Sequence, residues 1–415
     1  MKNIVIPDTF YPRGPNADNL ALLANDLMFK TCQKEEYWNR GFYIPYGCMN
    51  WRQSLPCKTY GPVKEDAIKQ GLIDSIEKYS NFEGNIFPKS LRLAAQHRQA
   101  PGKTYTLKRN LRAKKRFSFD EDDVIGLWLA SKLPLFSLDP GFNYIKLKAS
   151  LSSDAEARYQ QTKNEEDRWT DSKSNYLHMS YGKLLRHNLF ANRCEYGRFH
   201  SLFTQINREL RDFIQFNGKS LIEVDISNCQ PLILGILGKG DTYSTKRYEN
   251  MNLNLTEYSK YLSICSEGLL YEYLLDCSDG LFIDRDDVKA EFLPFLFAKN
   301  KRSMKSPFYS IFNSEFPSLA RYCVQMKKED HRALSWACQR FESKLMIDEA
   351  CGILRESNPE MPIITIHDSI MTTPEHQPEV EAAIYQAFSK YGVKPMLKIK
   401  GATTPCTTDS QDLAI

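Results

Sequence analysis

The sequence LIEVDISNCQPLIL, residues 221–234, joins a short apolar run to an abrupt polar turn. The run predicts a buried β-strand that ends at Asp225, and the residues after it predict the start of a helix. Ser227 and Gln230 have the spacing of a capping box, and Pro231 fits a first helical turn. These three residues therefore have a structural explanation, whereas a carboxylate at the end of an apolar strand needs a cation or hydrogen-bond donors nearby.

A second carboxylate stands in a similar setting further along the chain. In MPIITIHDSIMTT, residues 361–373, His367 and Asp368 lie between two apolar, β-prone runs, which predicts a hairpin with a His-Asp turn. A helix is expected over residues 378–391 and a strand over residues 395–400. The order of strand, helices, hairpin, helix and strand predicts an α+β fold with an antiparallel sheet backed by helices.

Two such carboxylates on adjacent strands suit a specific chemistry. They can share two divalent ions about 3.5–4 Å apart, which activate an attacking hydroxyl and stabilise the charge on phosphates. Mg²⁺ needs few protein ligands when substrate phosphates and water complete its coordination, so Asp225 and Asp368 suffice, with Mn²⁺ as an alternative ion. The pair therefore predicts a metal site for nucleotidyl transfer.

Residues 284–298, DRDDVKAEFLPFLFA, predict a helix with Asp284 as its N-cap. One face of this helix carries, in order, Arg285, Lys289, Leu293 and Phe297. Two cations one turn apart would neutralise the phosphates of a nucleotide, and the aromatic end would stack on a base. The alternative is an amphipathic helix with two snorkelling cations. Pro294 is expected to kink the helix or to end it early.

Bulk properties exclude several classes of protein. Hydrophobic residues make up 42% and aromatic residues 12% of the 415, which is typical of a globular chain. The 11 cysteines form no CxxC pair, which argues against structural zinc and for reduced thiols in a cytoplasmic protein. We expect no export signal and no membrane partner. Residues 235–240 lack the spacing of a phosphate-binding P-loop.

The N-terminal half offers fewer motifs. We expect irregular structure over residues 1–60, helices over residues 63–99, and a solvent-exposed helix over residues 151–169. Residues 103–116 are basic without an acidic residue, so they form either a solvated loop or a surface for nucleic-acid phosphates. The candidate phosphate contacts are Lys108, Arg109, Arg112, Lys114, Lys115 and Arg116.

Taken in order, these motifs resemble the polymerase domain of family A DNA polymerases, which are related to the single-subunit phage-type RNA polymerases. The resemblance covers residues 196–400 and rests on VDISNCQ, RDDVKAEFLPFLF and IHDSI, with Gly197-Arg198, Arg211 and Gln339 at matching places. It implies a right-hand polymerase with an antiparallel-sheet palm, helical fingers and a reduced thumb, plus a mostly helical N-terminal region. The implied parts are an accessory region (1–150), thumb-like helices and palm entry (151–215), and palm and fingers (216–415, fingers about 240–330).

The resemblance also implies residue roles. Asp225 and Asp368 would bind the metal ions and act in catalysis together with Lys289. The incoming nucleotide would be bound by Arg285, Lys289, Phe297 and Gln230. The primer–template would be contacted by Arg198, Gln339 and His367.

Three departures from the family pattern leave the choice of sugar open. Gln230 stands where the DNA enzymes usually have Glu, Ser369 follows the His-Asp pair as in the RNA enzymes, and Phe297 stands where Tyr is frequent. The expected function is a DNA-directed DNA polymerase of phage or mobile-element type, without a proofreading exonuclease, that extends a primer with dNTPs. The alternatives are a primase or small RNA polymerase that uses rNTPs, and a non-catalytic nucleic-acid-binding relative.

Overall fold

The chain forms two compact units, each of which is described by itself. The computed structural model describes residues 3–32, 44–45, 61–75, 81–82, 85–86, 90–108, 117–120, 122–163, 168–185, 189–238 and 254–401. The first unit comprises Met1–Arg116, Leu138–Leu189 and Gln205–Phe213, and the second Phe117–Ser137, Phe190–Thr204 and Ile214–Ile415. Within the described ranges, no helix has the length and apolar character needed to cross a membrane.

Regular structure begins at the N-terminus, so the expectation of irregular structure over residues 1–60 is wrong for the described part of that stretch. Strand β1 (Asn3–Pro7) pairs antiparallel with β7 (Gly102–Thr106). Helix α1 (Ala17–Cys32) follows and packs on β1. The partner of β1 lies far along the chain, which is why local sequence patterns did not reveal the pair.

The first unit mixes helices with short strands, which corrects the expectation of a mostly helical region. Within the stretch expected to be helical, α4 (Gly61–Lys69) and α5 (Ala95–Arg98) flank β3 (Ile73–Ser75) and β6 (Ser90–Leu93), which pair with each other. The other short strands are β2 (Ile44–Pro45), paired with β6, and the pair β4 (Asn81–Phe82) and β5 (Asn85–Ile86). The longer helices are α7 (Tyr144–Thr162), largely exposed as expected, and α8 (Asp171–Leu185).

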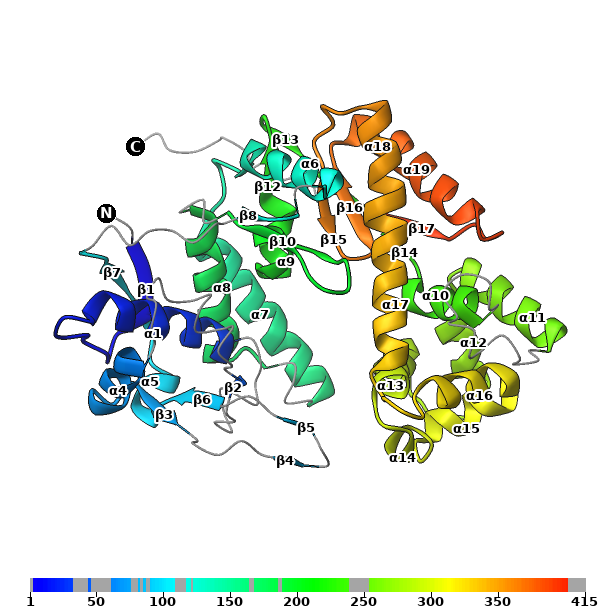
Figure 1. Ribbon diagram of the computed structural model, residues 1–415, viewed down its shortest axis with the longest axis horizontal. Helices are drawn as coiled ribbons and strands as arrows, with labels where there is room; N and C mark the ends of the chain where they lie inside the picture. The colour runs from blue at the N-terminus through cyan, green and yellow to red at the C-terminus, as the bar shows by residue number, and fades with distance from the viewer. Residues whose placement is uncertain are drawn as a thin grey trace. The chain divides into compact units, whose positions relative to one another are not determined.

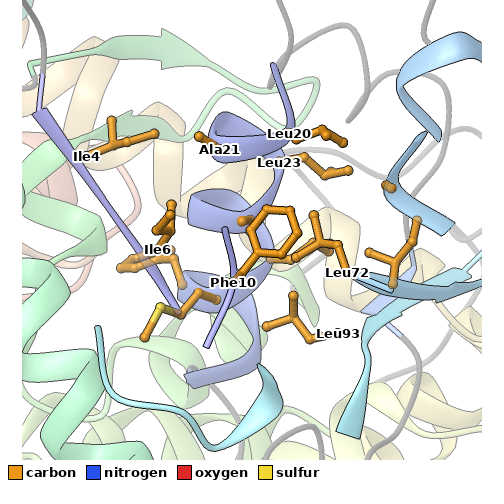
Figure 2. Packing of buried hydrophobic residues seen from close by; sticks show 14 of the residues in the cluster. Ile4, Ile6, Phe10, Leu20, Ala21, Leu23, Leu72 and Leu93 are labelled. Atoms are coloured by element: carbon orange, nitrogen blue, oxygen red, sulfur yellow. The ribbon is translucent and has the colours of Figure 1, made fainter. Parts of the chain in front are cut away.

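The core of the first unit lies between α1 and the strands around it. Figure 2 shows Ile4 and Ile6 from β1, Leu20 and Leu23 from α1, and Phe10 between them, all buried. Leu72 and Leu93 close the cluster from the side of β3 and β6. A cluster of this kind stabilises the unit through the removal of apolar surface from water.

The second unit is organised around a four-stranded antiparallel sheet in the order β15-β16-β14-β17. The bounds are β14 (Ile222–Ile226), β15 (Ile364–Ile366), β16 (Ser369–Thr372) and β17 (Leu397–Gly401). The strand that ends near Asp225, the hairpin and the C-terminal strand are thus confirmed. Since β14 alternates between buried and partly exposed residues, one face of this strand is packed and the other carries the polar side chains of Glu223 and Asp225.

Helices support this sheet. In Figure 1, α17 (Ala333–Ser343) and α18 (Cys351–Ser357) run on as one long rod, joined by a π-helical segment (Lys344–Ala350). α19 (Gln377–Ser389) packs on that segment and on β14. α10 (Cys229–Gly238), which follows β14, packs on α17.

A helical subregion follows α10 in the sequence. Its helices are α11 (Leu255–Ser266), α12 (Leu270–Asp276), α13 (Arg285–Phe297), α14 (Asn300–Ser303), α15 (Pro307–Glu315) and α16 (Pro317–Met326). Buried aromatic rings hold it together, and Phe312 contacts Phe292, Phe295 and Tyr261. α13 starts after the N-cap Asp284, as expected, but it continues past Pro294 instead of ending there.

Short strands and helices complete the second unit. Strands β12 (Ile214–Phe216) and β13 (Lys219–Ser220) form a hairpin whose turn residues Asn217 and Gly218 both have positive φ, as is typical of Asn-Gly hairpin turns. β9 (Phe136–Leu138) joins this hairpin, and β8 (Phe117–Ser118), β10 (Ala191–Arg193) and β11 (Phe199–Ser201) form another sheet. The remaining helices are α6 (Val124–Lys132) and the single turn α9 (Leu202–Gln205).

Candidate functional site

The two predicted aspartates lie next to each other in the sheet. Asp225 on β14 is opposite Ser369 on β16, and Asp368 is the residue before Ser369. The amide of Ile226 donates to the carbonyl of Asp368 at 3.4 Å, so the hairpin turn is held against the end of β14. His367 completes the turn in a left-handed conformation with φ 55°. The apolar runs therefore bring the carboxylates together, as expected.

Asp368 lies in an unfavourable electrostatic environment for a lone carboxylate. Burial raises the pKa of Asp368 to about 7, and the nearby negative charges of Glu342 and Asp225 add to the effect, which the Arg198 guanidinium partly offsets. Burial and the same carboxylates raise the pKa of the neighbouring Cys229 thiol. Such a cluster gains stability from a bound cation, because a divalent ion reverses the sign of the local field.

Glu342 on α17 is a site residue that the sequence reasoning missed. Its side chain is 2% exposed. Arg198 donates from Nε to Oε1 at 3.0 Å and from Nη2 to Oε2 at 2.8 Å, and Gln230 donates its amide to Oε2. Burial raises the pKa of Glu342 in spite of the guanidinium beside it. Glu342 therefore lies on the buried side of α17 in spite of its charge. The sequence did carry a signal for this position, because Glu342 lies four residues after Cys338 and three before Leu345, which places it on their side of the helix.

The same contact overturns the capping box. Gln230 reaches Glu342 and not the backbone of Ser227. Within the described residues, the Ser227 hydroxyl, the Asn228 amide and the Gln230 Oε1 are buried without a hydrogen-bond partner. Asn228 also has a left-handed backbone with φ 52°. Unsatisfied polar atoms and backbone strain after Asp225 are features of turns that meet a polar ligand or water.

The sheet face beside Asp225 supplies a second cation–carboxylate cluster. Lys400 on β17 donates from Nζ to Asp225 Oδ2 at 2.8 Å and lies 3.8 Å from Glu223 Oε1. Ser369 donates its hydroxyl to Glu223 Oε1 at 2.6 Å. Glu223 and Lys400 were also missed, because their contact depends on the pairing of β14 with β17.

The helix α13 places its predicted residues on a solvent-facing surface. Lys289 and Leu293 are exposed, and Phe297 is partly buried at the last helical position. Arg285 is engaged elsewhere, since Nε donates to Glu272 at 2.7 Å and the guanidinium lies 5.2 Å from the Tyr271 ring.

Tyr271 links this helix to the carboxylates electrostatically. Burial raises the pKa of the Tyr271 hydroxyl, the Arg285 charge lowers it, and the charge of Asp368 raises it further. α12, which carries Tyr271, packs on α13. The Tyr271 hydroxyl thus responds to the charges of both Arg285 and Asp368.

Two of the residues expected to contact nucleic acid are accessible. His367 is exposed at the hairpin turn, and its ring meets His200 edge-on with 6.3 Å between centroids. Burial lowers the pKa of His200, and the Arg198 charge lowers it further. Gln339 is partly exposed on α17, one turn before the π-helical segment. Irregular turns of this type recur at functional sites.

The basic segment lies mostly outside the described residues. Lys108 is exposed, and its backbone amide donates to Asp18. The first residues of the basic segment form part of β7, where Lys103 donates to the Asp8 carbonyl at 2.7 Å. The others proposed as phosphate contacts, which are not among the described residues, are Arg109, Arg112, Lys114, Lys115 and Arg116.

The carboxylate pair fits a Mg²⁺ site that relies on few protein ligands. Within the described ranges, no group of three or more His, Cys, Asp or Glu residues is arranged to hold a metal ion. The expected site uses two, Asp225 and Asp368, and the raised pKa of Asp368 is the observation that fits a cation there.

Comparison with known proteins adds no assignment. The sequence matches no protein-family model and no curated protein. The functional argument therefore rests on the geometry and electrostatics of the site.

Proposed function

We propose that this chain is a template-directed nucleotidyltransferase, and more specifically a DNA-directed DNA polymerase that extends a primer 3′ end. The observation that carries the proposal is the pair Asp225 and Asp368. Two neighbouring strands of one antiparallel sheet bring these carboxylates together, and burial, with the charges of Glu342 and Asp225, raises the pKa of Asp368 to about 7. A pair in this state is suited to hold divalent ions.

The proposal includes a finer assignment of the fold. The sheet β15-β16-β14-β17 serves as the palm of a right-hand polymerase, and the helices α11 to α16 serve as reduced fingers. The thumb is assigned to the stretch 151–215, and the region before it to an accessory role.

Each group has a part in the proposed reaction. Bound Mg²⁺ ions would supply activation of the primer hydroxyl and stabilisation of phosphate charge. Lys289, exposed on α13, binds the phosphates of the incoming nucleotide, and Arg285 joins it after release from Glu272. Phe297 lies against the nascent base pair. Gln339 and His367 contact the primer–template, and Arg198 holds Glu342 in place beside the carboxylates.

A primer-extension assay tests the proposal. Wild-type protein is given a DNA primer–template, Mg²⁺ or Mn²⁺, and either dNTPs or rNTPs. Asp225→Asn and Asp368→Asn should each reduce incorporation by roughly 10³-fold or more, because metal ions contribute several kcal/mol to such reactions. Binding to the duplex should remain within several-fold of wild type.

The matched control is Asp276→Asn, which changes an exposed carboxylate at the end of α12. It should extend the primer at the wild-type rate. Incorporation that persists in Asp225→Asn or Asp368→Asn would sink the site assignment. A wild-type protein that binds duplex but never extends it would favour a non-catalytic binding role.

A second candidate, synthesis of RNA, is favoured by one specific contact. Gln230 occupies the position associated with sugar choice, and its amide is committed to Glu342. A neutral side chain held in this way lacks the charge of the Glu that is usual in DNA enzymes. The ratio of dNTP to rNTP incorporation in the same assay separates the two candidates.

A further inference from the structure

The partly exposed face of β14 has a lysine from β17 next to the carboxylate that is expected to bind a metal ion.

 Lys400 on β17 lies diagonally across from Asp225 on β14, since its direct partner in the register is Glu223. Its Nζ donates to Asp225 Oδ2 at 2.8 Å. The Lys400 side chain is 40% exposed and that of Asp225 is 21% exposed, so water can reach the contact.

A second carboxylate lies within reach of the same ammonium group. Glu223 Oε1 is 3.8 Å from Lys400 Nζ, slightly beyond hydrogen-bonding range. The Ser369 hydroxyl donates to this same oxygen at 2.6 Å, which holds the Glu223 side chain in place. A small rotation of the flexible lysine side chain would therefore move its charge from one carboxylate to the other.

We propose that Lys400 is a positioning residue that occupies Asp225 before a divalent ion binds, and that Glu223 receives the ammonium group when the ion arrives. The inference rests on the proposed function, because it requires a divalent ion at Asp225. The ion and the ammonium group would repel each other and compete for the Asp225 carboxylate. Transfer of Lys400 to Glu223 keeps both positive charges paired with a carboxylate.

Competition between Lys400 and the ion, and a purely supporting role for Lys400, predict opposite changes in the affinity for the ion. If Lys400 only held Asp225 in place, its removal would weaken binding of the ion. If Lys400 competes with the ion, its removal should tighten binding by roughly two- to fivefold, the strength of a partly exposed ion pair. Loss of Glu223 should weaken binding, because the displaced ammonium group then has no carboxylate to join.

The test is a titration of the full-length protein with Mn²⁺ alone, without nucleotide, with free Mn²⁺ measured by electron paramagnetic resonance. Lys400→Met should bind Mn²⁺ roughly two- to fivefold more tightly than wild type. The matched control is Lys398→Met, which removes an exposed lysine opposite Asp225 on the same strand. It reports the general effect of one lost positive charge, and we expect a smaller change. Lys400→Arg should stay close to wild type.

Glu223→Gln completes the design. It should weaken Mn²⁺ binding in the wild-type background and have a smaller effect in the Lys400→Met background, because Glu223 acts through Lys400. Circular dichroism confirms that each variant is folded. Should Lys400→Met fail to fold, Lys400→Gln, which is also neutral, takes its place.

The outcomes distinguish this inference from the proposed function. If wild type extends a primer and binds Mn²⁺, but Lys400→Met binds no more tightly than Lys398→Met, the competition is refuted and the proposed function stands. If wild type neither extends a primer nor binds Mn²⁺, both are refuted. Equal effects of Glu223→Gln in the two backgrounds would also exclude Glu223 as the receiving carboxylate.

Discussion

The Glu342 side chain is buried near the carboxylates of Asp225 and Asp368, and its role follows from the residues that bind it. Arg198 binds it with two hydrogen bonds, and Gln230 adds a third. A buried charge that loses its partner is costly, whereas replacement of the whole pair by apolar residues is often neutral. The contact therefore fixes both the helix α17 and the turn that follows β14.

Removal of Arg198 alone should strongly destabilise the second unit. We expect Arg198→Leu to lower the free energy of unfolding by about 3–5 kcal/mol, because Glu342 would stay buried without its cation. Urea denaturation, followed by circular dichroism, measures the change. The double variant Arg198→Leu/Glu342→Leu should recover most of the loss. A double variant as unstable as the single one would show that packing of the Arg198 stem, and not the ion pair, is responsible.

Asp368 should make the stability of the cation-free protein depend on pH. The carboxyl group of an unfolded Asp has a pKa near 3.9, whereas burial and neighbouring carboxylates raise the pKa of Asp368 to about 7 in the folded chain. Between these values the folded protein holds a proton that the unfolded chain has lost. The free energy of unfolding should therefore fall as pH rises from about 4 to 7.

Denaturation at a series of pH values, with EDTA present, measures this dependence. In Asp368→Asn the fall should be smaller, because the titrating group is gone. Binding of Mg²⁺ should release a proton below pH 7 and strengthen as pH rises, which calorimetry in buffers of different ionisation enthalpy detects. An equal pH dependence in wild type and Asp368→Asn would assign the effect to another group.

Sequence patterns were sufficient to predict that some of these residues lie near each other, but not to predict the contacts of the others. Asp225 and Asp368 could be predicted as neighbours, because the apolar runs beside them define strands that end at the same place. Glu342 and Lys400 could not be linked to them from the sequence. Their contacts depend on the packing of α17 and on the pairing of β17 with β14, which join segments far apart in the chain.

At the scale of the element, α13 is the clearest agreement between sequence and structure. Its N-cap Asp284 accepts hydrogen bonds from two amides of the first turn. Its buried face packs with aromatic residues, and Lys289 remains exposed. Helix capping and periodicity are local signals, so this helix could be predicted closely. The π-helical segment after α17 could not, because its widened turn depends on packing against α19.

The exposed position of Lys289 allows a test of the two interpretations of α13. In a nucleotide-binding helix, Lys289→Met should lower kcat/KM for the nucleotide by roughly tenfold or more, the value of a charge-assisted contact with phosphate. The free energy of unfolding should change by less than about 0.5 kcal/mol, since the residue is exposed.

The matched control is Lys301→Met, which changes an exposed lysine on α14 beside the same helix. It should leave kcat/KM for the nucleotide close to wild type. A solvated amphipathic helix would give the opposite pattern, with Lys289→Met and Lys301→Met indistinguishable in steady-state extension assays.

At the scale of the whole molecule, prediction succeeded for the sheet and its helices and failed at the N-terminus. Elements of the second unit, such as β14 and the β15–β16 hairpin, carry apolar runs bounded by turn residues. In the first unit, β1 pairs with β7, which lies far from it in the sequence. A strand that pairs only with a distant segment has no neighbouring turn and partner strand in the sequence to reveal it. Pro7 and Pro12 made this strand still harder to predict.

Charge distribution over the whole chain gives the last prediction. The net charge is only +4, so binding to a polyanion should depend on local basic residues and not on a general field. If the segment that contains Lys108 contacts phosphates, replacement of Lys108, Lys114 and Lys115 by Ala should weaken duplex binding. Each lost contact should reduce the slope of log K against log salt by about 0.9.

A salt titration of fluorescently labelled duplex measures this slope. The matched control replaces Lys146, Lys148 and Lys163, exposed lysines on or at the end of α7, and removes the same charge. Its slope should stay near that of wild type if binding is local. Equal slopes in both triple variants would identify the basic segment as a solvated loop. The ratio of dNTP to rNTP incorporation should be unchanged in either variant, because contacts with backbone phosphates carry no information about the sugar of the incoming nucleotide.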